Sequence, residues 1–439
     1  MRGHDRGRFT DTPCTTHGEA VHVTEPAAYT VYVGIDWATT SHEVCVLSPE
    51  RAVVATRRVA HTAAGLDELV ALLATFGSAT AVAIGIEMPR GALIEALLAH
   101  GYPVYAINPK QSDRFRDRHT MAGAKDDRLD AFVIADALRT DRPCFRRVQS
   151  DEATVLQIRE YSRIDAELRD EQSRLTNRLR EQLYRYFPQV LTLCPAVDEP
   201  WVWALLAMAS TPAAAARLRR PRLAACLKTY RIRRLTADDV HAALATRAMV
   251  ESAGTIAAAA AHVALLLPRL TLVHAQQRTC AAALTHLLET LSAAHDTDPS
   301  APTPSDVQIL RSLPGVGLKT VAALFAEAAD AIATRDLAAL RAHAGIAPVT
   351  KRSGTRCVVV MRRACSGRLR TALYHASRVS AQCDAGAKQM YAALRARGHS
   401  HGRACRSVAD RMLRILMAML RTGTTYVTPT PAAPVMQPA

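Results

Sequence analysis

Between residues 30 and 147 the sequence alternates short apolar runs with helical ones, and this order constrains the fold more than any other feature. We expect strands at 31–37 and 43–47, paired as a hairpin, and further strands at 52–59, 80–87 and 103–107. We expect helices at 65–73, 92–100 and 126–138. Strands that alternate with helices after an opening hairpin predict an α/β domain with a mixed sheet.

Four carboxylates occupy related places in this pattern. Asp36 ends the first expected strand and Glu87 the fourth, while Asp127 and Asp130 share one face at the start of the helix expected at 126–138. Carboxylates that converge repel one another unless cations bind between them, and oxygen ligands favour Mg²⁺ or Mn²⁺. Two such ions can hold the attacking and leaving oxygens of a phosphodiester. Alternatively, the strand-end acids only flank turns and the helix acids stabilise a helix N-terminus; for the set of four we prefer the metal site.

The positive charge of the chain is concentrated near its C-terminus. The sequence has 55 Lys and Arg against 40 Asp and Glu, a net charge of +15. Residues 345–421 hold 16 basic residues and two acidic ones, Asp384 and Asp410, a local excess of +14. Clustered Lys and Arg bind polyanions by neutralising phosphates and releasing counterions. The sequence therefore predicts a nucleic-acid partner.

The basic segment also carries apolar residues, so we expect a folded domain there rather than a tail. These residues are Val358 to Met361, Leu369, Leu373, Val379, Met390, Leu394 and Met412 to Leu420. Tyr374 lies among them on a helical pattern, and we expect it to be a core residue.

Ser353 lies in a basic loop between Lys351, Arg352 and Arg356. Adjacent guanidinium groups can bind a scissile phosphate and favour the alkoxide of a serine. Serines in such loops otherwise contact phosphate or are solvated. Weaker candidates for a nucleophile are Thr350, Thr355 and Ser366. The arginines that follow are expected to contact nucleic-acid backbone: Arg362, Arg363, Arg368, Arg370 and Arg378.

Two further motifs are candidates for binding phosphate or metal. Gly315 and Gly317 form a turn before the helix expected at 318–327, whose first N–H groups can hold a phosphate. This turn resembles a helix-hairpin-helix motif, a sequence-independent DNA-binding unit; the alternative is a simple turn between helices. His399, His401 and Cys405 are close in sequence, but no second Cys or His pair completes a metal site.

The pattern divides the chain into five parts. Residues 1–29 and 422–439 are expected to be disordered, 30–148 to form the α/β domain, 149–305 a helical, coiled-coil-like region and 306–421 a mainly helical C-terminal domain. Apolar residues recur at spacings of four and seven in the first helix of the helical region: Ile164, Leu168, Leu175, Leu179, Leu183 and Phe187. Such a helix needs a partner, within the chain or from a second subunit. Residues 201–291 are also expected to be helical, and 292–305 to be a linker.

We expect neither a membrane span nor a signal peptide, and hence a cytoplasmic protein. The most apolar run, residues 256–267, has only 12 residues and ends before a proline. The N-terminus is polar and lacks the apolar core of a signal peptide.

Several of these motifs together resemble one known family. The DEDD transposases of the insertion-sequence 110 family are similar in Gly34-Ile35-Asp36, in Glu87 followed by Pro89 and Gly91, in Ile107-Asn108-Pro109, and in Lys125-x-Asp127-x-x-Asp130-Ala131. The second domain of that family is similar in Leu313-Pro314-Gly315-Val316-Gly317, in Ala344-Gly345-Ile346-Ala347-Pro348 and in Ser353-Gly354. The resemblance covers residues 31–148 and 306–421.

This resemblance implies a DNA transposase or recombinase of an insertion sequence, whose first domain has the ribonuclease H fold of Holliday-junction resolvases. It implies that Asp36, Glu87, Asp127 and Asp130 bind the metal and that Ser353 is the nucleophile that becomes joined to DNA. It also implies active sites shared between subunits of a dimer or tetramer, and an element-encoded non-coding RNA that pairs with target and donor DNA. Asp126 adds a carboxylate to the motif and leaves open which acids bind metal.

Three other functions stay open at this point. One is a metal-dependent, structure-selective endonuclease that hydrolyses DNA with water. Another is a sugar kinase, because Gly34 to Thr40 also resembles the first phosphate loop of actin-like kinases, but the sequence lacks their second Asp-x-Gly-x-Gly loop. The last is a scaffold that binds nucleic acid without catalysis.

Overall fold

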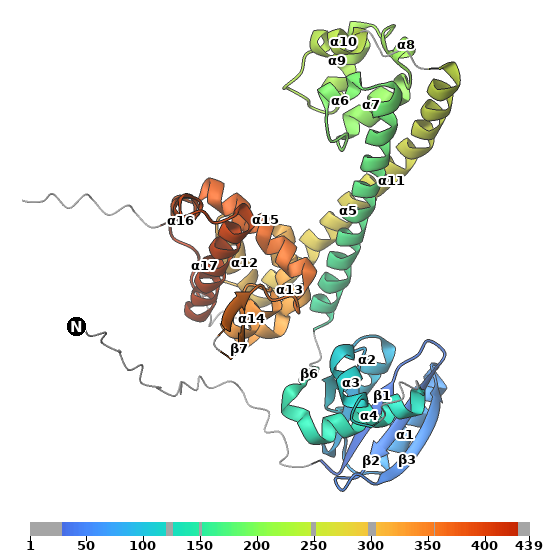
Figure 1. The fold of residues 1–439 in the computed structure, drawn as a ribbon, viewed down its shortest axis with the longest axis vertical. Coiled ribbons are helices and arrows are strands. Elements are labelled where there is room, and N and C mark those ends of the chain that lie inside the picture. The colour runs from blue at the N-terminus through green and yellow to red at the C-terminus, as the bar shows by residue number, and fades with distance from the viewer. Residues whose placement is uncertain are drawn as a thin grey trace, which may run out of the picture. The chain divides into compact units, whose positions relative to one another are not determined.

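A computed structural model describes residues 29–119, 126–148, 152–246, 252–296, 304–354 and 356–428. The chain divides into two compact units, Met1–Asp151 and Glu152–Ala439, and each is treated by itself (Figure 1). Residues 1–28 and 429–439, which belong to the segments predicted to be disordered, lie outside the described residues.

The N-terminal unit is built on a mixed sheet, as predicted. Its strands are β1 (Val31–Asp36), β2 (Ser41–Leu47), β3 (Val53–Ala60), β4 (Val82–Ile86), β5 (Val104–Ala106) and β6 (Arg146–Val148). They lie in the order β3-β2-β1-β4-β5-β6. β1 pairs antiparallel with β2 and parallel with β4, β5 continues parallel to β4, and β6 runs antiparallel to β5. The strand β6 was not predicted.

Helices cover both faces of this sheet. They are α1 (Ala63–Ala74), α2 (Ala92–Ala99), α3 (Pro109–Arg116) and α4 (Asp127–Asp141), with 3₁₀ turns η1 (Ala79–Ala81) and η2 (Arg142–Cys144). Val33 and Ile35 of β1 pack in one core with α1 and α2, whereas Tyr32 packs in another with α4. Because β1 and β4 are covered on both sides, both are apolar along their length, as central strands are expected to be.

The helix α3 was not predicted, because residues 107–109 were interpreted only as a turn. Those residues are instead the start signal of a helix. The side chain of Asn108 accepts from the backbone N–H of Lys110, Gln111 completes a capping box, and Pro109 occupies the first helical position.

The second unit is built along two long helices, α5 (Ala153–Tyr186) and α11 (Ala253–Asp296), which lie side by side (Figure 1). They run antiparallel, since Cys280 contacts Tyr161 while Arg269 is paired with Glu171. The partner that α5 requires is therefore within the chain. The helix α11 also continues through residues 292–296, where a linker was predicted.

The segment Ala253–Ala293 of α11 is long and apolar enough to cross a membrane by length and composition alone, with 39% of its most apolar window buried. Its buried side chains, such as Val263, Leu270 and Cys280, face the cores that it shares with α5. This packing is that of a core helix in a helical hairpin.

Two groups of short elements pack at opposite ends of the α5–α11 pair (Figure 1). One group surrounds Trp201 and comprises α6 (Gln189–Leu193), α7 (Pro200–Met208), α8 (Pro212–Ala215), α9 (Arg220–Thr229) and α10 (Ala237–Ala245). The other comprises α12 (Asp306–Ser312), α13 (Leu318–Ala333), α14 (Leu337–His343), β7 (Val349–Ser353), β8 (Arg356–Val360), α15 (Gly367–Cys383), α16 (Ala385–Ala396) and α17 (His401–Thr422). Its core also contains Ile158 of α5 and Leu284 of α11.

The basic segment is folded as expected, but part of its predicted core is not buried. Leu369, Leu373 and most apolar residues of α17 are buried, whereas Val359 is 63% exposed and Met361 42% exposed. Val359 belongs to the β7–β8 hairpin, which forms a separate two-stranded sheet, and Met361 directly follows it. Val379 and Tyr374 are also exposed, so the prediction of Tyr374 as a core residue was wrong.

The chain after α17 also differs from expectation at one residue. Tyr426 lies in the segment predicted to be disordered, yet its hydroxyl donates to Asp384 Oδ1 at 2.9 Å. Its backbone N–H donates to Ser312 Oγ at 2.8 Å. These two bonds attach the residue to α12 and α16.

Candidate active site

Two of the predicted carboxylates leave neighbouring strands at the same edge of the sheet. Ile35 of β1 is in register with Ile86 of β4, and the two strands are parallel. The residues that follow, Asp36 and Glu87, therefore lie side by side at the carboxyl ends of the strands. Both side chains are partly buried.

The other two predicted carboxylates, Asp127 and Asp130, lie in the N-terminal turn of α4. This helix approaches β1 and β4 closely because Gly34 and Gly85, paired across the strands, have no side chain beneath it. A Cβ at Gly34 would overlap the carbonyl oxygen of Ala131, and one at Gly85 would lie 3.0 Å from Ile134 Cγ2. The two glycines thus allow α4 to pack directly on the backbone of β1 and β4.

Within that turn the three acidic residues differ in environment. Asp126 is the N-cap, and its side chain accepts from the backbone N–H of Arg128 at 3.1 Å. Asp127 is exposed, whereas Asp130 is only 4% exposed. Capping gives Asp126 a structural role.

A guanidinium group lies in the acidic site. Arg116, the last residue of α3, donates from Nε to Asp130 Oδ1 at 2.6 Å and from Nη1 to Asp113 Oδ1 at 3.1 Å. Burial alone lowers the pKa of Arg116, but the hydrogen bond to Asp130 and the charges of Asp130, Asp113 and Glu87 raise it. The charge of Glu87 therefore also acts on this guanidinium.

The four carboxylates are not drawn together to metal-ligand distances. Among the residues that the structure describes, the one set of three side chains with potential ligand atoms within 4.8 Å of one another is Cys194, Asp198 and Glu199. Glu199 in that set is held by Arg234 at 2.7 Å. Burial and the charge of Glu199 raise the pKa of the Cys194 thiol, which disfavours the thiolate that a metal requires.

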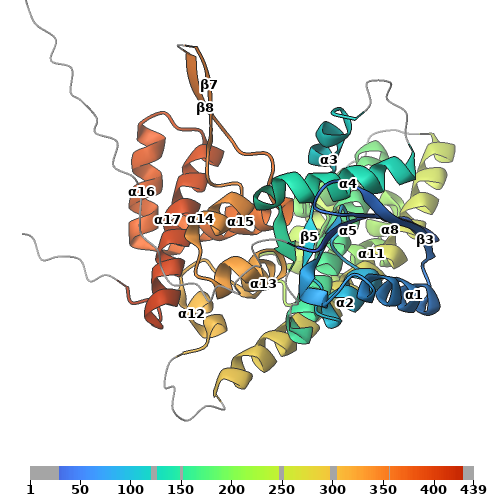
Figure 2. The same cartoon turned by 90° about the horizontal axis from the view of Figure 1, so that it is seen from below.

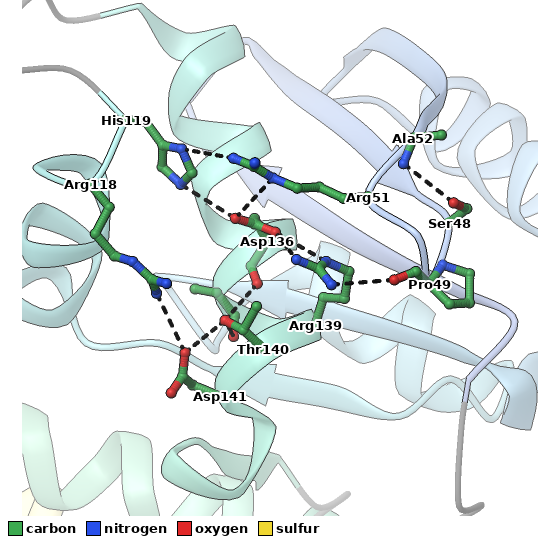
Figure 3. Close-up of polar contacts among 11 residues, drawn as sticks. Ser48, Pro49, Arg51, Ala52, Arg118, His119, Asp136, Arg139, Thr140 and Asp141 are labelled. Carbon is green, nitrogen blue, oxygen red and sulfur yellow. Dashed lines mark hydrogen bonds and ion pairs between the residues drawn. The ribbon is translucent and has the colours of Figure 1, made fainter.

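A second buried acid fixes the position of α4 (Figure 3). Asp136 is 5% exposed and accepts from Arg139 Nη2 at 2.7 Å. Arg51 Nε and His119 Nε2 each lie 3.4 Å from the other oxygen of Asp136, and Arg51 also contacts His119. Arg139 donates to the carbonyl of Pro49 at 3.2 Å. Asp136 thereby ties α4 to the β2–β3 turn and to the chain that follows α3.

His119 is in a cationic environment. Burial lowers its pKa, the charge of Asp136 raises it, and Arg51 and Arg118 lower it, with a net decrease. Burial and the two neighbouring guanidinium groups therefore favour the neutral form of His119.

The chain that follows Asp36 is held by a pair of histidines. The backbone N–H of Ala38 donates to His42 Nδ1 at 3.3 Å, so the proton of a neutral His42 is on Nε2, which lies 2.9 Å from His61 Nδ1. His42 is fully buried, and burial together with the charge of His61 lowers its pKa. This pair anchors the loop that follows Asp36.

In the second unit, Ser353 ends a strand rather than lying within a loop. It is the last residue of β7 and is opposite Arg356 of β8, with Gly354 in the turn at φ +56°. The alternation of a strand puts Lys351 on the same face as Ser353 and Arg352 on the other. Thr355 lies outside the described residues. Ser353 and these cations are exposed, and the hairpin projects away from α14 and α15 (Figure 2).

No described carboxylate neutralises the charges around Ser353. Among the described residues, Lys351, Arg352 and Arg356 form no ion pair with a carboxylate. Arg363 is exposed, whereas Arg362 is partly buried and its Nε has no hydrogen-bond partner in the described structure. An exposed hydroxyl among free cations suits contact with a phosphodiester.

The turn at Gly315 and Gly317 has two different sides. Gly315, at φ +93°, packs on α15, where a Cβ would lie 2.5 Å from the carbonyl oxygen of Ala376. Gly317 is the N-cap of α13, and a Cβ there would meet nothing within 4 Å. The first N–H groups of α13 are thus next to open space.

Comparison with known proteins matches both units. A family model of DEDD transposases of IS110 matches residues 33–188, and a model of the IS116/IS110/IS902 transposase family matches residues 307–392. The "Mini-circle putative transposase for IS117" of Streptomyces coelicolor is 31% identical over 419 residues, which are 93% of this chain and 98% of that protein. The chain belongs to the IS110 family of transposases.

Other relatives agree with this membership. The "Putative transposase y4uE" of Sinorhizobium fredii is 46% identical over 209 residues, which cover 47% of this chain and 58% of that protein. The "Insertion element IS110 uncharacterized 43.6 kDa protein" of Streptomyces coelicolor is 30% identical over 411 residues, 92% of this chain and 96% of that protein. The resemblance seen in the sequence motifs is confirmed, and this IS110-family member is a transposase, an enzyme whose partner is DNA.

The two matched ranges contain every residue predicted for the site. The four carboxylates lie in the first range, and Ser353, Gly315, Gly317 and the arginines near Ser353 lie in the second. Sequence reasoning missed Arg116, Asp136 and His42 in this transposase. No spacing rule relates them to the acids: Arg116, for example, lies 14 positions before Asp130, its partner in the folded structure.

Proposed function

We propose that this transposase cuts and rejoins DNA strands with an acidic quartet that binds Mg²⁺, or Mn²⁺, and with Ser353 as nucleophile. The proposal is supported by the parallel register of Ile35 and Ile86, after which Asp36 and Glu87 follow, and by the packing of α4, which carries Asp127 and Asp130, on Gly34 and Gly85 of the same two strands. The order β3-β2-β1-β4-β5, with β2 antiparallel, supports a ribonuclease H-like fold for this unit.

The residues present fit a divalent cation. The donors are all carboxylate oxygens, the ligand type that Mg²⁺ and Mn²⁺ prefer. The site also attracts positive charge, because the buried Asp130 is paired with Arg116 at 2.6 Å. When bound, the metal supplies positive charge to the scissile phosphate and to the oxygens that enter and leave.

In the proposed cleavage step, Ser353 Oγ forms an ester bond to the scissile phosphorus and the bond from phosphorus to a sugar oxygen breaks. The serine proton is lost, and the departing sugar oxygen takes up a proton. Rejoining is the reverse step with the hydroxyl end of another strand, which releases Ser353. Lys351, Arg352 and Arg356 hold the phosphate and stabilise the charge that develops on it, and Arg362 and Arg363 contact neighbouring phosphates. Gly317 gives the backbone of the DNA access to the start of α13, and Gly315 allows the turn before it to pack on α15.

We further propose that the enzyme acts as a homodimer or homotetramer and is guided by a structured non-coding RNA encoded by its element. The unpaired basic residues of the second unit suit RNA as well as DNA. Leu265 and Leu272 of α11, seven residues apart, are 71% and 58% exposed and suit contact with a second subunit. Active sites would then combine the quartet of one subunit with Ser353 of another.

The test is recombination of a plasmid that carries the ends of the element, with and without the flanking non-coding RNA. We expect the wild-type enzyme to recombine only with the RNA, and Asp36→Ala and Ser353→Ala each to lower the rate by at least about 10³-fold, as loss of a group that acts in the reaction does. If both variants recombine normally, the proposed mechanism is wrong.

The same variants separate this function from a structure-selective endonuclease that uses water. An endonuclease would still cut DNA after Ser353→Ala, whereas the proposed enzyme would not. Denaturing gels and mass spectrometry of the trapped complex would detect a covalent link between DNA and Ser353. Arg220→Gln, at an exposed residue of α9 that is already paired with Asp238, is the matched control and should leave recombination unchanged.

A further inference from the structure

A pocket of about 260 Å³ lies between α15 and α17 in the second unit. Its floor is apolar and includes Ile346 and Leu373, and Met361 lines it at the foot of the β7–β8 hairpin. We call it the α15–α17 pocket. It is smaller than the roughly 300–1,000 Å³ typical of sites for drug-sized ligands, so its size suits a single planar ring system.

Two guanidinium groups line this pocket, from Arg370 and Arg406. Their bonds within the protein are to sulfur: Arg370 Nη1 lies 3.5 Å from Cys365 Sγ, and Arg406 Nη2 lies 2.9 Å from Met361 Sδ. Neither is ion-paired among the described residues, and no acidic residue lines the pocket. Both cations are therefore available to an anionic ligand.

An aromatic ring stands at the same pocket and is held by a histidine. Tyr374 is 37% exposed, and its hydroxyl lies 3.0 Å from His401 Nε2. The other ring nitrogen of His401 lies 2.7 Å from the hydroxyl of Tyr391. The two bonds to His401 fix the Tyr374 ring beside the arginines. The conformational entropy of this side chain is therefore lost on folding and not on ligand binding.

An apolar floor, one fixed aromatic ring and two unpaired guanidinium groups are what an unstacked nucleotide needs: a surface for its base and cations for its phosphate. We propose that the α15–α17 pocket binds one unpaired nucleotide of the DNA substrate, with the base against Tyr374 and the phosphate at Arg370 and Arg406. This inference rests on the proposed function, in which DNA reaches Ser353.

The hairpin sets the distance from this nucleotide to the scissile phosphate. Ser353 is in register with Arg356, and Met361 follows five residues later. At about 3.3 Å per residue the pocket is about 17 Å from Ser353 along the strand, which is about five nucleotides at 3.4 Å per nucleotide of one strand. A nucleotide held in the pocket thus determines which phosphate faces the serine.

The test measures binding of the full chain in EDTA, which withholds the metal and prevents cleavage. The probes are a DNA duplex with one unpaired nucleotide, the fully paired DNA duplex, and the same two duplexes made of RNA. We expect about five- to 150-fold tighter binding of the DNA with the unpaired nucleotide, the range found for one base stacked on an aromatic side chain. Equal affinity for the two DNA duplexes, or a larger preference in RNA, would overturn the inference.

Four variants test whether the preference for the unpaired nucleotide arises in the α15–α17 pocket. Gly402 lines the pocket, and a Cβ there would meet nothing within 4 Å, so Gly402→Leu can add a side chain at the pocket. We expect Gly402→Leu and Tyr374→Ala to abolish the preference, and Tyr374→Phe, which keeps the ring, to retain it. Complete loss of the preference in Tyr374→Phe, which lacks only the hydroxyl, would contradict stacking on the ring as its source. Arg406→Gln should also reduce the slope of log affinity against log salt by about 0.9.

Matched controls come from the same chain. Gly254→Leu adds the same side chain at another open helical glycine, and Arg397→Gln removes an exposed cation outside the pocket; both should keep the preference. If the paired duplex binds well but no preference exists, only the pocket assignment fails. If no DNA binds at all, the proposed function fails with it.

Discussion

Arg116 shows how one residue can decide the state of an acidic site. It provides the positive charge nearest to the buried Asp130, and it lies at the end of α3, next to the chain that leads to α4. Since an unpaired buried carboxylate is costly, Arg116 stabilises Asp130 in the folded protein.

We expect Arg116→Leu to lower the free energy of unfolding of the N-terminal unit by about 3–5 kcal/mol, the usual cost of leaving a buried charge unpaired. Arg114→Leu, on the same helix but exposed, is the control and should cost under about 0.5 kcal/mol. Urea unfolding followed by circular dichroism measures both. Equal losses in the two variants would show that the charge of Arg116 does not stabilise Asp130.

Two other single residues make the N-terminal unit sensitive to acid. The pKa values of His42 and His119 are lowered in the folded protein, mainly by burial. Below about pH 6.5 the unfolded chain therefore binds protons that the folded one does not. Stability is fully present above that pH and decreases as the pH falls toward the lowered pKa values.

We expect His42→Gln to reduce the loss of stability between pH 7 and pH 5, because this change removes one of the groups that take up a proton on unfolding. His100→Gln, at an exposed position after α2, serves as the comparison and should leave the pH dependence as it is. Thermal unfolding at several pH values measures this dependence of stability on pH. An unchanged slope in His42→Gln would refute the role assigned to burial.

At the scale of elements, the position of α4 depends on the strands beneath it. Gly34 and Gly85 let the helix lie against the backbone of β1 and β4, and Asp136 ties its middle to the β2–β3 turn. The first of these contacts determines how near Asp127 and Asp130 come to Asp36 and Glu87. The packing of α4 on Gly34 and Gly85 should therefore matter for the proposed acidic site.

Gly34→Ala should destabilise the N-terminal unit by about 1–3 kcal/mol or more, because the new Cβ overlaps the backbone of Ala131 and Ala135. Recombination should fall further than stability alone explains, since α4 is pushed away from the sheet. Gly254→Ala, in an open position of α11, should be neutral or slightly stabilising. Wild-type activity in Gly34→Ala would contradict the close approach.

At the scale of the whole molecule, the residues proposed for catalysis are distributed over the two units. The carboxylates lie in the unit that ends at Asp151, whereas Ser353, the unpaired basic residues and the α15–α17 pocket lie in the other. Each unit has its own hydrophobic cores. The units should consequently respond differently to metal ions.

We expect Mg²⁺ to raise the unfolding temperature of the N-terminal unit only, by an amount equivalent to about 2.7 kcal/mol at 100 times the dissociation constant. EDTA should reverse the effect and Asp36→Asn should abolish it, while Ser353→Ala should keep it. Differential scanning calorimetry of the full chain measures this. A shift confined to the C-terminal unit would show that the quartet is not the metal site.

Much of the fold followed from local patterns, and the misses have physical causes. The strands β1 and β4 were predicted because both faces are buried and their residues are continuously apolar. The strand β6, with Arg146 and Arg147 among its three residues, exists through its pairing with β5 and has no apolar pattern. The exposure of Tyr374 was missed because a helical apolar period does not reveal a pocket beside it.

The sequence by itself determined the places of the acids at strand and helix ends, the concentration of charge near Ser353 and the family of the chain. These features are encoded in residues that are close in sequence. Tertiary structure alone decided that Arg116 pairs with Asp130, that α4 lies on Gly34, and that Tyr374 shares a pocket with Arg406. Each depends on packing between distant segments, because burial and pairing are set by whichever atoms the fold brings into contact.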